Sequence, residues 1–136
     1  MPLSDFLSCP EDQLEAIITK DEPYSDGAWF TAKNIGMIQL CELGELLKVG
    51  SYDELKNGFG LVGEPLPDGP WPEKTPPALI TKLRQISDTE IQSVAQVWAR
   101  TDGLTGVSSA NLVDYLTRLR DFLKQQSNPI FLINAL

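Results

Sequence analysis

The stretch that decides the predicted fold is Ser108-Ser-Ala-Asn-Leu-Val-Asp-Tyr-Leu-Thr-Arg-Leu-Arg-Asp-Phe-Leu-Lys124. Its apolar side chains recur three and four positions apart, which is the spacing of one face of a helix. This stripe consists of Leu112, Tyr115, Leu116, Leu119, Phe122 and Leu123. Ser108 or Ser109 can cap the helix at its start, and Pro129 lies beyond its end. We expect one amphipathic helix that buries this stripe.

Three further helices are expected in the middle of the chain. Serine precedes glutamate by three positions at Ser51–Glu54 and again at Ser87–Glu90, which is the pattern of a capping box. Pro76 suits the first turn of a helix, where its missing N–H has no partner to lose. The expected helices cover about 51–58, 76–86 and 88–101.

Two more helices are expected near the N-terminus. One opens at Pro10 and is stopped by Pro23. The other covers about 31–48, where apolar residues recur at helical spacing. Gly36 and Gly44 lie inside it and each weakens a helix by about 1 kcal/mol relative to alanine.

A Pro/Gly-rich loop separates the two halves of the chain. Residues 59–77 hold six prolines and three glycines, which excludes helix for most of this stretch. We therefore predict an all-α fold with a loop at about 59–75. The prediction is a single compact domain over residues 1–136, with five or six helices in an antiparallel bundle or an orthogonal array. Two subdomains, 1–58 and 76–136, are the alternative.

The charge of the chain is acidic and unevenly distributed. There are 19 acidic and 11 basic residues, and the net charge is −8. A phosphate backbone or an anionic membrane surface would be repelled, so we expect neither nucleic acid nor membrane as a partner. Residues 1–30 contain seven acids and one lysine. Asp21, Glu22 and Asp26 are therefore candidate contacts for a basic protein partner.

Aromatic and proline residues in the loop give a second candidate surface. Pro67 and Pro70 form a P-x-x-P pattern, and Trp71 follows directly. Such a segment can dock into an aromatic groove of a partner. In the alternative reading, the prolines stiffen the loop and Trp71 pins it to the core. An exposed Trp71 would be the strongest anchor for a partner.

The sequence lacks residues that several kinds of catalytic and metal-binding site require. The sequence contains no histidine, which removes the commonest general base, the Ser–His and Cys–His nucleophiles and nearly all catalytic zinc sites. Cys9 and Cys41 have no metal-ligand spacing. The glycines of Gly58–Gly63 match a dinucleotide motif but lack the preceding strand and the following helix. We predict no catalytic, cofactor-binding or metal-binding residues.

The ends of the chain add two expectations. The first residues carry neither the basic nor the long apolar segment of a secretory signal, so we expect a cytoplasmic protein. The apolar run Ile130–Ile133 is far shorter than the roughly 20 residues of a membrane span. We expect the tail to dock on its own domain or on a second subunit, which would make a homodimer.

These observations favour a non-enzymatic cytoplasmic protein that acts through protein–protein interaction. An acidic regulator or antidote of a basic partner would suit the charge distribution. A helical domain that binds a small apolar ligand beneath the Pro-rich loop is the alternative. An enzyme that works with carboxylates alone is a third reading, and it requires two facing acids in a cleft.

Overall fold

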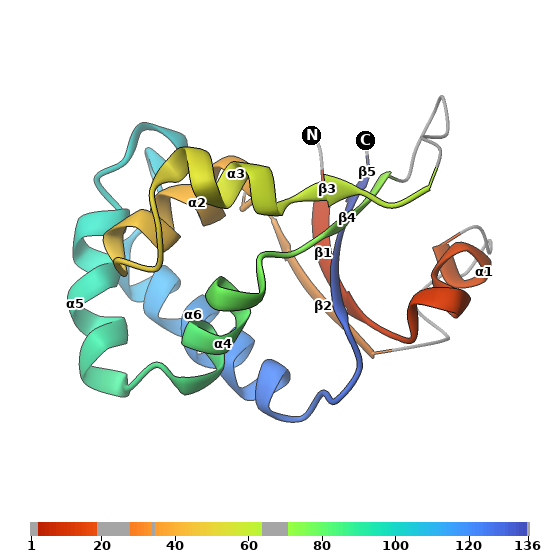
Figure 1. Ribbon diagram of the computed structural model, residues 1–136. Coiled ribbons are helices and arrows are strands. Elements are labelled where there is room, and N and C mark those ends of the chain that lie inside the picture. Colours follow the sequence, from red (N-terminus) through yellow and green to blue (C-terminus); the bar gives the residue numbers. More distant parts are fainter. Residues whose placement is uncertain (1–2, 19–27, 34, 64–70, 136) are drawn as a thin grey trace.

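The computed structural model describes residues 3–18, 28–33, 35–63 and 71–135 and shows a mixed α/β fold. Strands and helices are interspersed along the chain (Figure 1). The elements are β1 (Leu3–Ser8), α1 (Leu14–Ile18), β2 (Ala28–Lys33), α2 (Met37–Leu46), α3 (Tyr52–Gly58), β3 (Gly60–Leu61), β4 (Trp71–Lys74), α4 (Pro77–Gln85), α5 (Asp88–Trp98), α6 (Ser109–Lys124) and β5 (Ile130–Ala135). The expectation of an all-α helical bundle is wrong, because an antiparallel sheet forms the middle of the molecule.

The sheet joins the two ends of the described chain. Its strand order is β2-β1-β5-β4-β3, and all neighbouring pairs are antiparallel. β1 and β5 lie side by side in the centre, with Leu7 opposite Phe131 and Phe6 opposite Leu132. The apolar tail therefore pairs on both sides within its own chain, which covers it without a second subunit.

Burial on both faces explains why these strands carry no alternating pattern. Phe6 and Leu132 belong to the core beneath the helices, whereas Leu7 and Phe131 belong to a second core on the opposite face. A strand buried on both faces reads as a short apolar run rather than as alternating apolar and polar residues. The run at 130–133 was the visible signal of β5.

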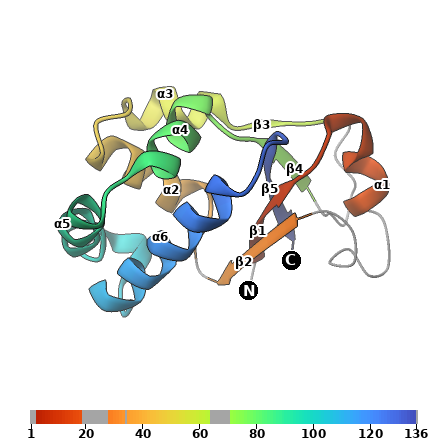
Figure 2. The same cartoon turned by 90° about the horizontal axis from the view of Figure 1, so that it is seen from below.

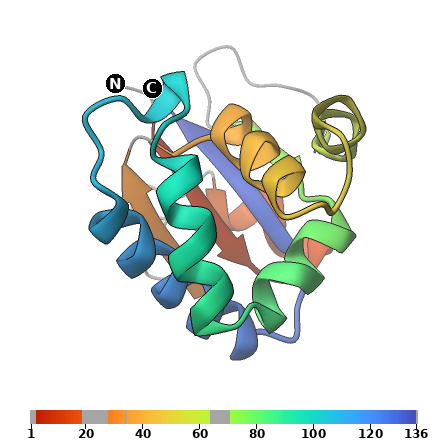
Figure 3. The same ribbon diagram turned by 90° about the vertical axis from the view of Figure 1, so that its left-hand side faces the viewer.

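The helices cover the two faces of the sheet unequally. α2, α4, α5 and α6 lie on one face, and α1 lies on the other (Figures 1 and 2). Viewed from the helical side, α5 is outermost and the sheet lies behind the helices (Figure 3). The larger core contains Leu40 and Leu55 from before the Pro/Gly-rich stretch and Leu83, Trp98 and Leu116 from after it.

The helix expected over 31–48 is wrong in its first part. Residues 28–33 form the edge strand β2, and α2 begins only at Met37. Phe30 of β2 packs beneath α6, with its ring centroid 5.6 Å from those of Tyr115 and Phe122. Tertiary burial of this side chain overrides the helical spacing of the sequence. The Gly36 N–H donates to Gln39 Oε1 at 2.9 Å and so marks the start of α2.

The capping signals correctly located three helix starts. The Ser51 hydroxyl accepts from the Glu54 N–H at 3.2 Å, and the Ser87 hydroxyl accepts from the Glu90 N–H at 3.2 Å. At α6, Ser108 rather than Ser109 is the cap, and it accepts from the Asn111 N–H. These helices begin where the sequence indicates because caps are local interactions.

The Pro/Gly-rich stretch is only partly a loop. Residues 60–61 and 71–74 form the antiparallel strands β3 and β4, although 59–75 was expected to be irregular throughout. Pro72 lies within β4 and is buried. Pro76 is the N-cap residue of α4, and the hydroxyl of Thr75 before it donates to the carbonyl oxygen of Ile130 at 2.8 Å. Through this bond the start of α4 is held against β5.

Among the described residues, no helix has the length and apolar character needed to cross a membrane.

Candidate functional site

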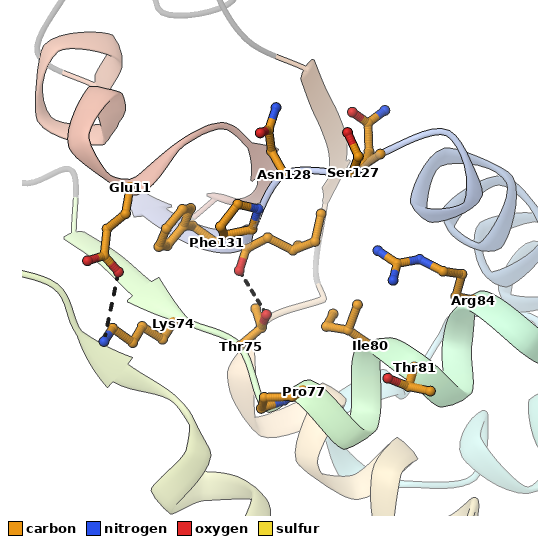
Figure 4. Close-up of a pocket in the computed structure, with 13 residues that line it drawn as sticks. Glu11, Lys74, Thr75, Pro77, Ile80, Thr81, Arg84, Ser127, Asn128 and Phe131 are labelled. Atoms are coloured by element: carbon orange, nitrogen blue, oxygen red, sulfur yellow. Dashed lines mark hydrogen bonds and ion pairs between the residues drawn. The ribbon is translucent and has the colours of Figure 1, made fainter.

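A pocket of about 470 Å³ opens at the junction of the sheet and the helices (Figure 4). One wall is α4, with Pro77, Ile80, Thr81 and Arg84. The opposite wall is the segment 126–131, which connects α6 to β5. We refer to this site as the α4 pocket. Its volume is in the range of pockets that hold small molecules.

Arg84 places a guanidinium group in the α4 pocket, and a hydrogen bond to the backbone orients this group. Its Nε donates to the carbonyl oxygen of Leu123, near the end of α6, at 2.9 Å. Figure 4 shows the guanidinium directed into the space between α4 and the segment that carries Ser127 and Asn128. In the described part of the chain the terminal nitrogens form no further hydrogen bond or ion pair. They remain available as paired N–H donors.

The other end of the α4 pocket carries an ion pair. Lys74 Nζ lies 3.8 Å from Glu11 Oε1, and both side chains are mostly exposed. Thr75 lies between this pair and Arg84 (Figure 4). Glu11 is the single carboxylate of the pocket lining, and its charge is offset by Lys74. The pocket thus leaves the positive charge of Arg84 uncompensated.

A second group of polar side chains surrounds Cys41 on the helical face of the sheet. Burial raises the pKa of the Cys41 thiol to about 11, and Glu73 and Glu42 add to this rise while Lys56 opposes it. The thiol is fully buried, so it stays protonated and unreactive at neutral pH. Two carboxylates therefore lie within electrostatic reach of one buried side chain.

Both carboxylate side chains are half-buried. Burial raises the pKa of Glu73 above its ordinary value, and a hydrogen bond from the Asn134 side chain partly opposes this rise. Glu42 Oε2 is inaccessible to solvent and has no hydrogen-bond partner among the described residues. Neither residue forms an ion pair in the described part of the chain. A carboxylate without a cation in such a place costs free energy.

Two apolar side chains stand next to Glu73 on the sheet. Leu61 of β3 pairs directly with Glu73 and is 54% exposed. Trp71 lies two positions before Glu73, so both side chains project from the same face of β4. Trp71 is half-buried. We call Glu42, Glu73, Leu61 and Trp71 the α2–β4 patch.

The residues singled out from the sequence are only partly described. Trp71 opens β4 and takes part in further interactions within the chain. The other five candidates, Asp21, Glu22, Asp26, Pro67 and Pro70, lie outside the described residues. The central part of the Pro-rich loop that was predicted to form a lid, residues 64–70, also lies outside them. The α4 pocket itself is not between helices alone, because the segment leading into β5 forms one of its walls.

A smaller groove of about 390 Å³ lies between the end of α2 and α5. Leu46, Leu47, Val94 and Val97 supply its apolar surface, and Val97 is 46% exposed. Glu90 is its one carboxylate, and it forms an ion pair with Lys82 at 2.6 Å. This groove presents a small apolar surface.

The described residues contain no group of three or more Cys, Asp or Glu side chains that could hold a metal ion.

Comparisons with protein-family models, with curated proteins and with solved structures found no match to this chain.

Sequence reasoning missed Arg84 and Glu73 as candidate residues. Each occupies an ordinary position in the sequence, on a helix or in a short strand. The partners that make them unusual come from remote segments, since Leu123 is 39 positions from Arg84 and Asn134 is 61 positions from Glu73. The sequence offers no local signal for either contact.

Proposed function

We propose that this protein is a cytoplasmic binding protein that contacts a basic protein partner through the α2–β4 patch. One observation carries the proposal. Glu42 and Glu73 are each half-buried near Cys41, and neither has a cationic partner in the described part of the chain. An arginine or lysine from another protein would supply the missing charge.

The energetics favour an intermolecular cation. A carboxylate that has already lost part of its hydration in the free protein gains more from pairing than a fully hydrated one. Glu73 is in this state, because burial is the largest influence on its pKa. The net charge of −8 would also attract a basic partner over a distance and speed its association at low salt.

Leu61 and Trp71 supply the apolar part of the proposed contact. A leucine that is 54% exposed leaves apolar area for a partner to cover. Tryptophan at the centre of an interface often contributes a large share of the binding free energy. Their position beside Glu73 gives the patch the mixture of an apolar centre and charged neighbours that is typical of protein interfaces.

Binding rather than catalysis agrees with the composition of the two pockets lined by described residues. The α4 pocket contains one carboxylate, Glu11, and the groove beside α5 contains one, Glu90. Each forms an ion pair with a lysine. A hydrolase that used carboxylates alone would need two of them facing each other across a cleft. An acidic binder that covers a basic partner would act as its regulator or antidote.

Two free buried cysteines support a cytoplasmic location. Cys9 and Cys41 are both buried and have free thiols. Free thiols of this kind persist in reducing compartments.

The experiment compares three forms of the full chain as immobilised bait for extracts of the cells that express it. They are the wild type, the double variant Glu42→Gln/Glu73→Gln, and the control Asp12→Asn/Glu15→Gln. The control removes two exposed acids near α1, on the other face of the sheet. A captured protein is identified, purified and titrated against all three forms at low and high salt.

We expect a basic protein that binds the wild type and the control alike. The variant at Glu42 and Glu73 should bind it at least about tenfold more weakly, a loss of about 1.4 kcal/mol. Raising the salt concentration should weaken the wild-type complex. Equal binding by all three forms, binding that does not respond to salt, or an acidic partner would each contradict the proposal.

A further inference from the structure

We propose that the α4 pocket binds a small organic acid, with the carboxylate of the acid held by Arg84. The inference is independent of the protein contact proposed above, because it uses different residues. The α2–β4 patch lies around Cys41, whereas the α4 pocket lies between α4 and the segment 126–131.

Arg84 is positioned as a carboxylate receptor. Its Nε is held by the Leu123 carbonyl oxygen at 2.9 Å, so the plane of the guanidinium is fixed before a ligand arrives. The two terminal nitrogens then present parallel N–H groups to the pocket, and a carboxylate accepts such a pair with both oxygens. Because the side chain is already ordered, less conformational entropy is lost on binding.

The remaining surface fits an apolar body with a few polar groups. Pro77, Ile80 and Pro129 form apolar walls, and Thr81, Ser127 and Asn128 add neutral hydrogen-bonding groups. Figure 4 shows Pro77, Ile80 and Thr81 on one side of the opening, and Ser127 and Asn128 on the other. A volume of about 470 Å³ accommodates a small molecule and is too small for a folded partner.

The charges of the pocket favour one anionic group. Lys74 is engaged by Glu11, which leaves a single uncompensated cation, Arg84. A carboxylate carries one charge and matches this arrangement, whereas a phosphate dianion calls for more cations. The acidic surface of the rest of the protein is screened within about 8 Å at physiological ionic strength. It does not prevent a direct contact with Arg84.

The test uses two acids, hexanoate and 3-phenylpropanoate, with their neutral amides and inorganic phosphate as comparison probes. Binding is measured by calorimetry and by chemical-shift changes in the full chain. The variants are Arg84→Gln, which removes the charge, and Thr81→Trp, which fills the opening from an exposed position of α4. Arg100→Gln is the matched control, because Arg100 is exposed and lies outside the pocket lining. Circular dichroism checks that each variant is folded.

We expect each acid to bind the wild type at least tenfold more tightly than its amide. Arg84→Gln should reduce the affinity for the acid to that for the amide, and Thr81→Trp should weaken both. Arg100→Gln should change neither. If Arg84→Gln does not fold, Thr81→Trp still decides whether the pocket is the site. Equal affinity for acid and amide, no binding at millimolar concentrations, tighter binding of phosphate, or unchanged binding by folded Arg84→Gln or Thr81→Trp would overturn the proposal.

Discussion

The indole Nε1–H of Trp98 donates a hydrogen bond to the carbonyl oxygen of Gln39 at 3.0 Å. This bond joins the end of α5 to the first turn of α2, across 59 positions of sequence. Trp98 is fully buried, and its ring also lies 6.1 Å from that of Tyr115 in α6. One side chain thus holds three helices together on the helical side of the sheet.

Replacing this tryptophan should measure the strength of that connection. Trp98→Phe removes the N–H donor and part of the buried volume, so we expect a loss of about 2 kcal/mol in the free energy of unfolding. Urea denaturation gives this value. Val97→Ala, at the neighbouring exposed position, should change stability by less than about 0.5 kcal/mol. A Trp98→Phe variant as stable as the wild type would show that the bond adds nothing.

The buried carboxylate of Glu73 should make stability depend on pH. Its pKa is raised in the folded protein, so the folded state binds more protons than the unfolded state between the ordinary pKa of about 4.3 and the raised one. The free energy of unfolding therefore falls as pH rises through this window and stays lower above it. Glu73→Gln removes the charge and retains an oxygen that can accept from Asn134.

The expected result is a variant more stable than the wild type at neutral pH. Below the ordinary pKa the difference between the two should vanish, because Glu73 is then protonated in both states. Urea denaturation at several pH values from about 4 to about 7 follows both proteins. Asp12→Asn, which removes an exposed carboxylate, serves as the control. A difference between Glu73→Gln and the wild type that stays constant with pH would refute the assignment.

The parts of the fold that the sequence predicts correctly are those fixed by neighbouring residues. Ser51, Ser87 and Ser108 each cap the helix that they precede, and the bonds span three positions. The strands depend instead on remote partners. Leu7 and Phe131 face each other across the middle of the sheet, and neither segment shows where the other lies. Strands buried on both faces also lose the alternation that would identify them.

The residues of the candidate site also divide into those recognisable from neighbouring residues and those that depend on remote partners. Trp71 is recognisable as unusual from its type and its proline-rich surroundings. Arg84 and Glu73 resemble ordinary surface charges in the sequence. They differ only because Leu123 and Asn134 contact them in the folded chain. Sequence reasoning could therefore name an aromatic anchor, and it could not locate the two charges that the structure sets apart.

Close packing of α2 on α3 should make Gly44 sensitive to substitution. A Cβ atom at this position would overlap Leu55 Cδ1 and lie 3.4 Å from its Cγ. Leu55 is 4% exposed and has little room to move. We expect Gly44→Ala to destabilise the protein by about 1 kcal/mol, although alanine favours a helix by a similar amount. In a Leu55→Ala background the overlap is gone, so the same change should stabilise. A double-mutant cycle checks this reversal of sign, and equal effects in both backgrounds would exclude the contact as the cause.

The end of α2 offers a substitution that should stabilise the protein. Lys48 has a φ of 61°, in the left-handed region, and follows the last helical residues as the turn residue of a Schellman motif. In that motif its N–H donates to the Glu45 carbonyl oxygen at 3.1 Å and the Val49 N–H donates to that of Gly44 at 2.9 Å. A residue with a Cβ atom is strained in this conformation by about 1 kcal/mol, and glycine is not. Lys48→Gly should therefore raise the free energy of unfolding by up to about 1 kcal/mol. Lys48→Ala is the matched control, because it removes the same charge and keeps the strain. If both variants gain equally in urea denaturation, the loss of the lysine side chain rather than relief of backbone strain is responsible.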